Sequence, residues 1–247
     1  QETREDWVRW DSDTRSVQAR RRRRLGELIL KDDPLPKPDP GAVRAALLVG
    51  LRELGLSALP WTSASEQLRA RLQWLRPALP ESAADWPDWS DAALLATLDT
   101  WLGPWLTGMT RPDALRGLDL HEMLLQSLDH RQRQAIERLA PTHIQVPTGS
   151  QVRLDYSVGG EAPILAVKVQ ELYGLGETPR VGGGRVPVIL HLLSPAQRPV
   201  QITRDLAGFW ASSYALVRKD LRGRYPRHDW PEDPAHAHPS RGVKRRG

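Results

Sequence analysis

The sequence predicts an α+β fold: a helical subdomain, then an antiparallel β-sheet subdomain with a C-terminal helix, preceded by a β-hairpin. Two patterns predict it. Between residues 41 and 140 apolar residues recur every three to four positions, as on the buried face of a helix, and after Pro141 they recur at every second position, as in strands. The strands follow one another directly instead of alternating with helices, which is typical of α+β proteins rather than of a parallel βαβ sheet.

Residues 1–31 are predicted to form the β-hairpin. Residues of high strand propensity flank the segment Asp11-Ser-Asp-Thr, which is typical of a turn because Asp bonds backbone groups two residues on. Two strands are marginally stable in water, so we expect the hairpin to be the end of a larger sheet or to pack against the next segment. Residues 32–40 contain four prolines and are predicted to be a linker, since proline interrupts helices and sheet ladders.

Capping residues divide the helical subdomain, residues 41–140, into short helices. Such helices gain most of their stability by packing against one another. A glycine is expected to end the first helix, and four polar side chains are placed to cap the helices that follow. These positions are Gly55, then Ser63 with Glu66, Ser90, Asp119, and Asp129 with Gln132.

Residues 141–230 are predicted to be the β-sheet subdomain. Ile144 and Val146 are expected to face the strand that contains Val152, across the turn Pro147-Thr-Gly-Ser. A final helix is expected over about residues 205–221. Residues 231–247 are predicted to be a basic, proline-rich tail. Further strands are expected near residues 165–169, 186–193 and 200–203.

The chain has ten tryptophans against one phenylalanine and four tyrosines. We expect the tryptophans of the helical subdomain to pack in its core, and Trp210 to hold the final helix in place by packing. For Tyr225 and Trp230, which sit among arginines, packing and stacking on nucleic-acid bases are both open. The tryptophans predicted to be in the core are Trp61, Trp74, Trp86, Trp89, Trp101 and Trp105.

The net charge of +5 is unevenly distributed along the chain. Residues 1–31 hold 9 basic and 6 acidic side chains, residues 32–140 hold 11 and 15, and residues 198–247 hold 11 and 5. A basic start and a basic end around an acidic middle indicate a localised anion-binding surface. A solvated, arginine-rich surface is the alternative.

Composition restricts the class of protein further. The chain has no cysteine, which excludes disulfides and thiolate metal sites and suits a cytoplasmic protein. No apolar run approaches the roughly 20 residues that a membrane-spanning helix needs. The segment after Gln1 lacks the apolar stretch of a signal peptide. Because the chain begins at Gln rather than Met, we expect it to be a fragment of a longer protein.

Two basic segments are candidates for binding single-stranded nucleic acid. The run of five arginines would direct two or three guanidiniums to one face of a strand, where phosphates could bind; the alternative is an edge strand that its charge protects from aggregation. The C-terminal segment mixes cations with an aromatic ring that could stack on a base. The candidates are Arg20, Arg21, Arg22, Arg23, Arg24, Arg218, Lys219, Arg222, Arg224, Tyr225 and Arg227.

A glycine-rich turn is a candidate phosphate site. Consecutive glycines expose backbone N–H groups, and flanking arginines could hold the anion. The alternative is an ordinary hairpin turn, since no Gly-Lys-Ser/Thr closes the segment as in a nucleotide-binding P-loop. The residues of this candidate site are Arg180, Gly182, Gly183, Gly184 and Arg185.

No catalytic residues and no metal ligands are predicted. His121-Glu begins like a zinc-protease helix, but Leu125 stands where the second histidine ligand would be needed. There is no Gly-x-Ser-x-Gly nucleophile elbow and no acidic metal-binding box. We therefore expect no catalysis and no cofactor in this chain itself.

Several segments resemble the HrpB-type bacterial ATP-dependent RNA helicases of the DEAH-box class. The main one reads Arg198-Pro-Val-Gln-Ile-Thr-Arg-Asp-Leu-Ala-Gly-Phe-Trp, followed by Tyr214-Ala-Leu-Val-Arg-Lys-Asp-Leu-Arg-Gly-Arg-Tyr-Pro. Similar segments occur in order along nearly the whole chain. They are Leu25-Gly-Glu-Leu-Ile-Leu, Leu68-Arg-Ala-Arg-Leu, Leu139-Ala-Pro-Thr-His, Arg153-Leu-Asp-Tyr, Gln170-Glu-Leu-Tyr-Gly-Leu-Gly-Glu-Thr-Pro, and residues 182–193.

The resemblance implies a role in a larger protein. Residues 1–31 would be the end of an OB-fold, and residues 40–247 the C-terminal region that distinguishes the family. ATP and Mg²⁺ would bind the helicase core of the same polypeptide, whose motifs are absent from this chain. The expected function is that of an accessory region that contacts single-stranded RNA without motor activity. The alternative is a protein-docking or scaffolding module with a protein partner, and salt-dependent RNA binding distinguishes the two.

Overall fold

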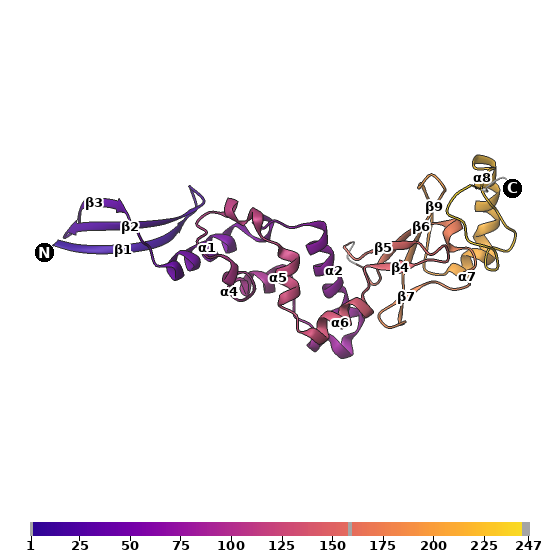
Figure 1. Cartoon of the computed structure of the whole chain (residues 1–247), viewed down its shortest axis with the longest axis horizontal. Helices are drawn as coiled ribbons and strands as arrows, with labels where there is room; N and C mark the ends of the chain where they lie inside the picture. Colours follow the sequence, from indigo (N-terminus) through magenta and orange to yellow (C-terminus); the bar gives the residue numbers. More distant parts are fainter. Residues whose placement is uncertain (1, 158–159, 244–247) are drawn as a thin grey trace. The chain divides into compact units, whose positions relative to one another are not determined.

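The computed structural model describes residues 2–157 and 160–243, and they form two compact units (Figure 1). Unit 1 comprises residues 1–66 and 88–129, and unit 2 comprises residues 67–87 and 130–247. Helices and sheets are both present, as an α+β fold requires. The division falls inside helix α2 (Ser63–Ala78), so the units do not follow the change from helix to strand along the chain.

Unit 1 begins with a three-stranded antiparallel sheet, where the sequence predicts only a hairpin. The third strand ends at Pro34 and includes Asp32 and Asp33 of the predicted linker, because both residues pair with arginines of the second strand. The central strand is β2, hydrogen-bonded on both sides. The strands are β1 (Glu2–Asp11), β2 (Ser16–Leu25) and β3 (Leu28–Pro34).

The sheet is fixed to the first helix of unit 1, α1 (Pro40–Leu54), at the end where β1 turns into β2. The indole of Trp10 packs directly on Gly50, where any side chain would overlap the ring. The hydroxyl of Ser12 donates to Glu53 Oε2 at 2.8 Å. These contacts supply the support that an isolated three-stranded ribbon needs.

The helices of unit 1 surround a leucine core. Leu47, Leu51, Leu98 and Leu102 are at most 1% exposed. Such apolar burial is the main term that holds short helices together. After α1 come η1 (Leu56–Ala58), the first turn of α2, α3 (Asp91–Ala96), α4 (Leu98–Trp101), η3 (Gly103–Trp105), η4 (Pro112–Gly117) and α5 (Leu120–Gln126).

The predicted capping residues are largely confirmed. Gly55 ends α1 with φ 77°, and the side chains of Ser90 and Asp119 accept from the N–H groups three residues on. At α2 the cap lies one residue before the predicted Ser63. Thr62 Oγ1 accepts from the N–H of Ser65, and Ser65 Oγ accepts from the N–H of Thr62, so the two residues cap each other.

Four of the six tryptophans predicted to be in the core are buried. They are Trp74, Trp86, Trp89 and Trp101, each at most 7% exposed. The prediction that Trp105 lies in the core is wrong, because this residue is 40% exposed at the end of the short helix η3.

In unit 2 the helices and the sheet share a core. The helices are the rest of α2, η2 (Pro80–Asp85) and α6 (His130–Leu139). Trp74 packs edge-on against Tyr156 of the sheet at a centroid distance of 5.4 Å, and its indole N–H donates to the carbonyl of Glu161. Arg71 is buried and donates to the carbonyl of Ala140 at 2.6 Å.

The main sheet of unit 2 is mixed, which corrects the prediction of an antiparallel sheet. Its order is β10-β9-β6-β5-β4, and β6 pairs with β9 in parallel. The residues between these two strands form a crossover with its own two-stranded hairpin, and parallel neighbours need such a connection. The strands are β4 (His143–Gln145), β5 (Gln151–Asp155), β6 (Ile164–Lys168), β9 (Ile189–Leu193) and β10 (Pro199–Thr203); the crossover holds η5 (Val169–Leu172), β7 (Arg180–Val181) and β8 (Val186–Pro187).

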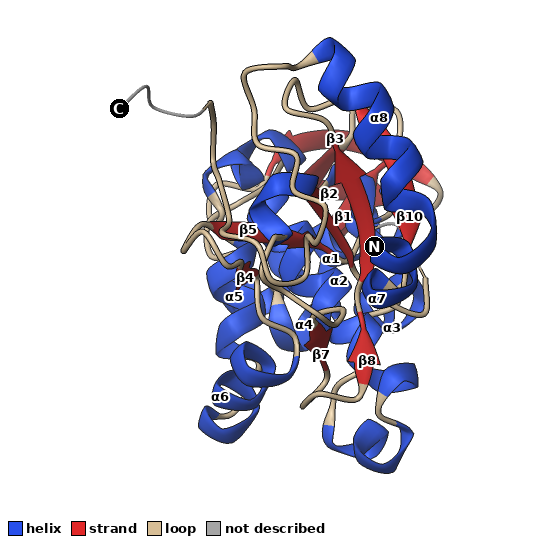
Figure 2. Ribbon diagram, turned by 90° about the vertical axis from the view of Figure 1, so that its right-hand side faces the viewer, coloured by secondary structure: helices blue, strands red, loops and turns tan. Residues whose placement is uncertain are grey.

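The final helix is longer than predicted and begins irregularly. It consists of α7 (Leu206–Gly208), the π-helical turn η6 (Phe209–Ser213) and α8 (Tyr214–Arg224). Asp205 caps its start by accepting from the N–H of Gly208 at 2.8 Å. Figure 2 shows α8 beside the edge strand β10. A single π turn of this kind shifts the faces of the residues that follow it.

The segment after α8 is tied to unit 2 as far as the structure describes it. The N–H of Gly174 donates to the carbonyl of Pro234, and the N–H of Ser240 donates to that of Gln170. Arg241 donates to the carbonyl of Thr148 at 2.7 Å. The part of the predicted tail up to residue 243 is therefore anchored by backbone hydrogen bonds, and residues 244–247 lie outside the described residues.

Candidate nucleic-acid interface

The arginine run of β2 is paired with acidic side chains of the two flanking strands. Asp32 of β3 accepts from Arg20 at 3.0 Å and from Arg22 at 2.8 Å. On the other face, Arg21 makes two hydrogen bonds of 2.7 Å with Asp6 of β1. The remaining pairs are Arg23 with Glu2 and Arg24 with Glu5.

These pairs largely neutralise the run. The hydrogen bond from Arg21 holds the pKa of the Asp6 carboxyl below its ordinary value, and that from Arg22 does the same for the pKa of Asp32. Arg22 also lies over the ring of Trp7, 4.9 Å from its centroid. The alternative of a charged edge strand is wrong, because β2 is the central strand of its sheet. Phosphates could bind here only by exchanging with these carboxylates.

The glycine-rich turn connects β7 and β8, and several of its groups are used within unit 2. All three glycines have positive φ, between 64° and 84°, which favours glycine. The N–H of Gly182 donates to the carbonyl of Leu139 at 2.7 Å. Arg180 donates to the carbonyls of Gly184 and Arg185, and the side chain of Arg185 pairs with Glu81. These contacts already use several groups that a phosphate would need, and phosphate binding remains a prediction.

Helix α8 distributes the C-terminal candidates over two faces. One face lines a hollow of about 500 Å³, and the opposite face lines a hollow of about 310 Å³ that reaches β10. The helical period explains the split, since positions three, four and seven apart share a face. The first hollow is lined by Ala215, Arg218, Lys219, Arg222, Gly223 and Pro226, and the second includes Arg224 and Tyr225 among its residues.

The five basic side chains among the C-terminal candidates differ in whether they already have hydrogen-bond or ion-pair partners. Arg218 is 23% exposed and donates to the carbonyl of Trp230 at 2.9 Å and to Glu232 at 3.1 Å, so it joins α8 to the following segment. Arg224 pairs with Asp220 one turn earlier. Within residues 2–157 and 160–243, Lys219, Arg222 and Arg227 are exposed and have no ion pair.

The aromatic residues near α8 act mainly in packing. Trp230 is 7% exposed, and its indole N–H donates to the carbonyl of Tyr225, which resolves the open question for Trp230 in favour of packing. Trp210 packs against Tyr214 at 5.2 Å and donates to the carbonyl of Leu175, as expected. Tyr225 is half-buried and touches His228 edge-on.

Burial perturbs the titration of several groups in α8 and in the segments near it. Tyr173 is completely buried and its hydroxyl lies 3.2 Å from that of Tyr214; burial raises the pKa of both hydroxyls. Burial, with a smaller contribution from Lys168, lowers the pKa of His228. These side chains support the helix and do not point to proton-transfer chemistry. In the part of the chain that the structure describes, no group of three or more potential metal ligands occurs.

Sequence reasoning missed one group of cations. Arg15, Arg111 and Arg116 line the same cavity in unit 1, although nearly a hundred residues separate the first from the second. No local motif marks any of them. Among the described residues, no helix combines the length and the apolar character needed to cross a bilayer.

Comparisons with known proteins agree on the family that this chain resembles. The sequence model of the family described as "ATP-dependent helicase C-terminal" matches residues 101–234, and that described as "ATP-dependent RNA helicase HrpB, connector region" matches residues 3–35. The ATP-dependent RNA helicase HrpB of Escherichia coli (strain K12) is 45% identical over 240 residues, which are 97% of this chain and 29% of that protein.

Solved structures give the same result. The crystal structure of the E. coli DExH-box NTPase HrpB superposes with a TM-score of 0.80 at 44% identity, covering 96% of this chain and 29% of that one. The crystal structure of the E. coli DEAH/RHA helicase HrpB gives 0.69 at 42% identity, covering 93% and 29%. The chain thus spans less than a third of the length of these relatives. It belongs to the HrpB family of ATP-dependent helicase C-terminal regions.

Proposed function

We propose that this chain is the accessory C-terminal region of a cytoplasmic ATP-dependent RNA helicase and that it binds single-stranded RNA along α8. It has no motor activity of its own, and ATP and Mg²⁺ bind the helicase core elsewhere in the same polypeptide. Residues 1–31 form the end of an OB-fold. The subdomain boundaries near residues 40, 140 and 230 are part of this proposal.

The observation that carries the proposal is the basic hollow on the first face of α8. Lys219 and Arg222 lie one turn apart on that face, exposed and without a carboxylate partner among the described residues. Free cations gain more from a phosphate than paired ones, because no existing ion pair has to be broken. Arg218 at the base of the hollow is held by Trp230 and Glu232 and so fixes the helix beneath the two cations.

Fluorescence anisotropy with labelled single-stranded RNA over a salt series tests the proposal. The slope of log K against log salt is about −0.7 per phosphate on single strands. If Lys219 and Arg222 each bind one phosphate, the variant Lys219→Ala/Arg222→Ala should flatten the slope by about 1.4. The matched control is Arg224→Ala, which removes a cation of the same helix from the opposite face and should leave the slope unchanged.

The other predicted sites rank below this hollow. If Arg224→Ala flattens the slope and the double variant does not, RNA binds the second face, and Tyr225→Ala should then cost roughly 1–3 kcal/mol of binding free energy because of a lost stacking contact. If neither variant changes the slope, RNA binds elsewhere, and Arg20–Arg24 and the glycine-rich turn are the next sites to test. RNA binding through either would require exchange of existing contacts.

Protein docking is the second candidate function. Leu216 is 75% exposed on α8, beside a hollow lined by Val200, Val217 and Leu221. A large exposed apolar side chain beside a hollow with several apolar residues in its lining is typical of an interaction surface. The absence of any RNA binding at low salt would reject the RNA proposal in favour of docking.

A further inference from the structure

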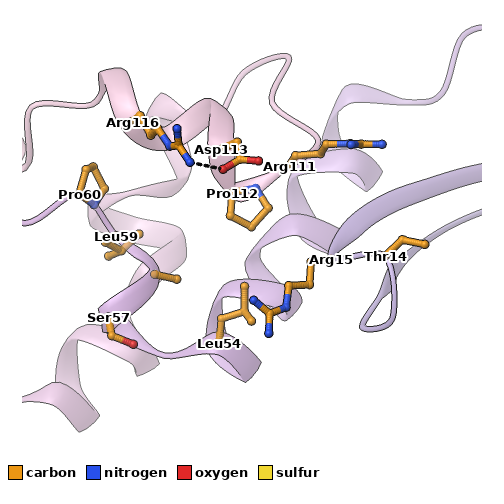
Figure 3. Close-up of a pocket in the computed structure, with 11 residues that line it drawn as sticks. Thr14, Arg15, Leu54, Ser57, Leu59, Pro60, Arg111, Pro112, Asp113 and Arg116 are labelled. Atoms are coloured by element: carbon orange, nitrogen blue, oxygen red, sulfur yellow. Dashed lines mark hydrogen bonds and ion pairs between the residues drawn. The ribbon is translucent and has the colours of Figure 1, made fainter.

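A hollow of unit 1 lies where the turn between β1 and β2 meets the helices. Its volume is about 690 Å³, within the usual range of small-molecule sites. Figure 3 shows Arg15 on one side of it and Arg116 on the other. Its apolar wall is formed by Leu54, Ala58, Leu59, Pro60 and Pro112, and its polar residues are Thr14, Arg15, Ser57, Arg111, Asp113 and Arg116.

The charge of this hollow contrasts with that of the sequence range that supplies most of its lining. Residues 32–140 hold 15 acidic and 11 basic side chains, yet the lining has three arginines and one aspartate. Arg116 pairs with Asp113 at 2.9 Å, but both side chains are at least 80% exposed, and such surface pairs exchange readily. Among the described residues, the guanidinium groups of Arg15 and Arg111 have no hydrogen-bond or ion-pair partner.

The backbone places Arg15 in an uncommon conformation. Its φ is 46°, in the left-handed region that residues other than glycine rarely adopt. Asp11 holds the turn by accepting from the N–H groups of Asp13 and Thr14, both at 3.0 Å. The N–H of Val17 donates to the carbonyl of Thr110, next to Arg111. This hydrogen bond joins the turn that contains Arg15 to the segment that contains Arg111. Strained residues that the surrounding structure holds in place are frequent at ligand sites.

We infer that this hollow is a second binding site, for a nucleotide. The phosphate binds the guanidiniums of Arg15 and Arg111, and the base packs on the apolar wall around Leu59 and Pro60. Guanidinium groups suit phosphate because their N–H donors match its oxygens in pairs. A compact hollow with cations on its rim and an apolar wall fits one nucleotide better than it fits an extended acidic peptide. The nucleotide is either a free one or a residue of an RNA strand.

Calorimetric titration of the 247-residue chain tests the inference with AMP, adenosine, inorganic phosphate, oligoadenylate and an acidic hexapeptide as separate probes. AMP should bind at least about tenfold more tightly than adenosine or phosphate, since each of these lacks one half of the contacts. Arg15→Asn should weaken AMP by about tenfold or more, because Asn tolerates the left-handed backbone but removes the charge. Ser57→Trp, which fills the hollow and keeps all three arginines, should weaken AMP as well.

Control variants distinguish AMP binding at this hollow from binding at α8 and from effects of misfolding. Arg44→Asn removes an exposed arginine of α1 that does not line the hollow, and it should leave the AMP affinity unchanged. Lys219→Ala/Arg222→Ala should also leave AMP binding unchanged, so the two sites can fail independently. Unchanged melting temperatures would show that each variant is folded. If oligoadenylate depends on Arg15 more strongly than AMP does, the source of the nucleotide is an RNA strand.

Two results would overturn the inference. One is equal AMP affinity for the unsubstituted chain and for Arg15→Asn. The other is binding of the acidic peptide together with no binding of AMP, which would assign the hollow to an acidic protein segment.

Discussion

Arg22 donates to the carboxylate of Asp32 at 2.8 Å, and the same carboxylate also accepts from Arg20. One acidic residue of β3 therefore pairs with two of the five consecutive arginines. This relationship determines how much of the basic run is available to a polyanion, and it leads to the first prediction.

Asp32→Asn should raise the affinity for single-stranded RNA at low salt, because Arg20 and Arg22 lose the carboxylate that they share. If each then binds a phosphate, the slope of log K against log salt steepens by up to about 1.4. Anisotropy over a salt series measures it. Asp33→Asn, which frees only Lys31, is the control, and an equal effect of both variants would contradict a specific role of Asp32.

Gly50→Ala should destabilise unit 1. A methyl group at this position overlaps the indole of Trp10, so either the ring or the sheet must move away from α1. Overpacking of this kind costs about 1–3 kcal/mol. Urea denaturation followed by tryptophan fluorescence measures the loss. Gly117→Ala, where a methyl group meets no atom within 4 Å, is the control, and equal midpoints for the two variants would count against the packing of Trp10 on Gly50.

Arg218→Ala should lower the free energy of unfolding by about 1–3 kcal/mol, because it removes hydrogen bonds to the carbonyl of Trp230 and to Glu232. Arg218→Lys should not restore the loss, since one ammonium cannot reproduce the forked geometry of the guanidinium. Chemical denaturation provides the measurement. Lys219→Ala, on the exposed side of the same helix, should have no effect, and a full rescue by lysine would show that charge alone matters.

Acidification below pH 6.5 should destabilise unit 2 through His228. Burial lowers the pKa of this histidine from its ordinary 6.5, so the unfolded chain binds a proton at a higher pH than the folded chain does. The contribution of neutral His228 to folding stability is complete above pH 6.5 and declines as the pH falls toward the lowered pKa of the folded chain. Melting temperatures between pH 7.5 and 5 should fall less in His228→Gln. Parallel curves for the two proteins would refute the assignment to His228.

The chain should hydrolyse no ATP, because its sequence contains no phosphate-binding loop and no acidic metal-binding motif. A coupled assay at several protein concentrations measures turnover. A rate above the buffer blank that grows in proportion to the chain concentration would show that a nucleotide-hydrolysing site is present. AMP binding at the hollow of unit 1 is compatible with zero turnover.

The sequence by itself determined the features that depend on neighbouring residues. Ser90 and Asp119 cap helices because a side-chain oxygen can reach an N–H three residues on, whatever the rest of the fold does. Apolar residues at every second position around Ile144, Val152 and Leu165 likewise predicted strands, because this period depends only on the local backbone. The similarity to helicases of the HrpB type was also readable from the sequence, since it consists of segments in a fixed order.

Tertiary structure decided which charges are free and which strands meet. Arg20 to Arg24 looked like a phosphate site, but acidic residues of β1 and β3 occupy all five, and pairing across strands is not visible in a local pattern. The parallel pairing of β6 with β9 depends on where a crossover places the chain. The hollow lined by both Arg15 and Arg111 brings together distant segments, which the packing of Trp10 on Gly50 and the hydrogen bond from Val17 to Thr110 hold in place. Local hydrogen bonds follow from short spacings, whereas ion pairs and cavities depend on residues that the fold brings together from distant parts of the chain.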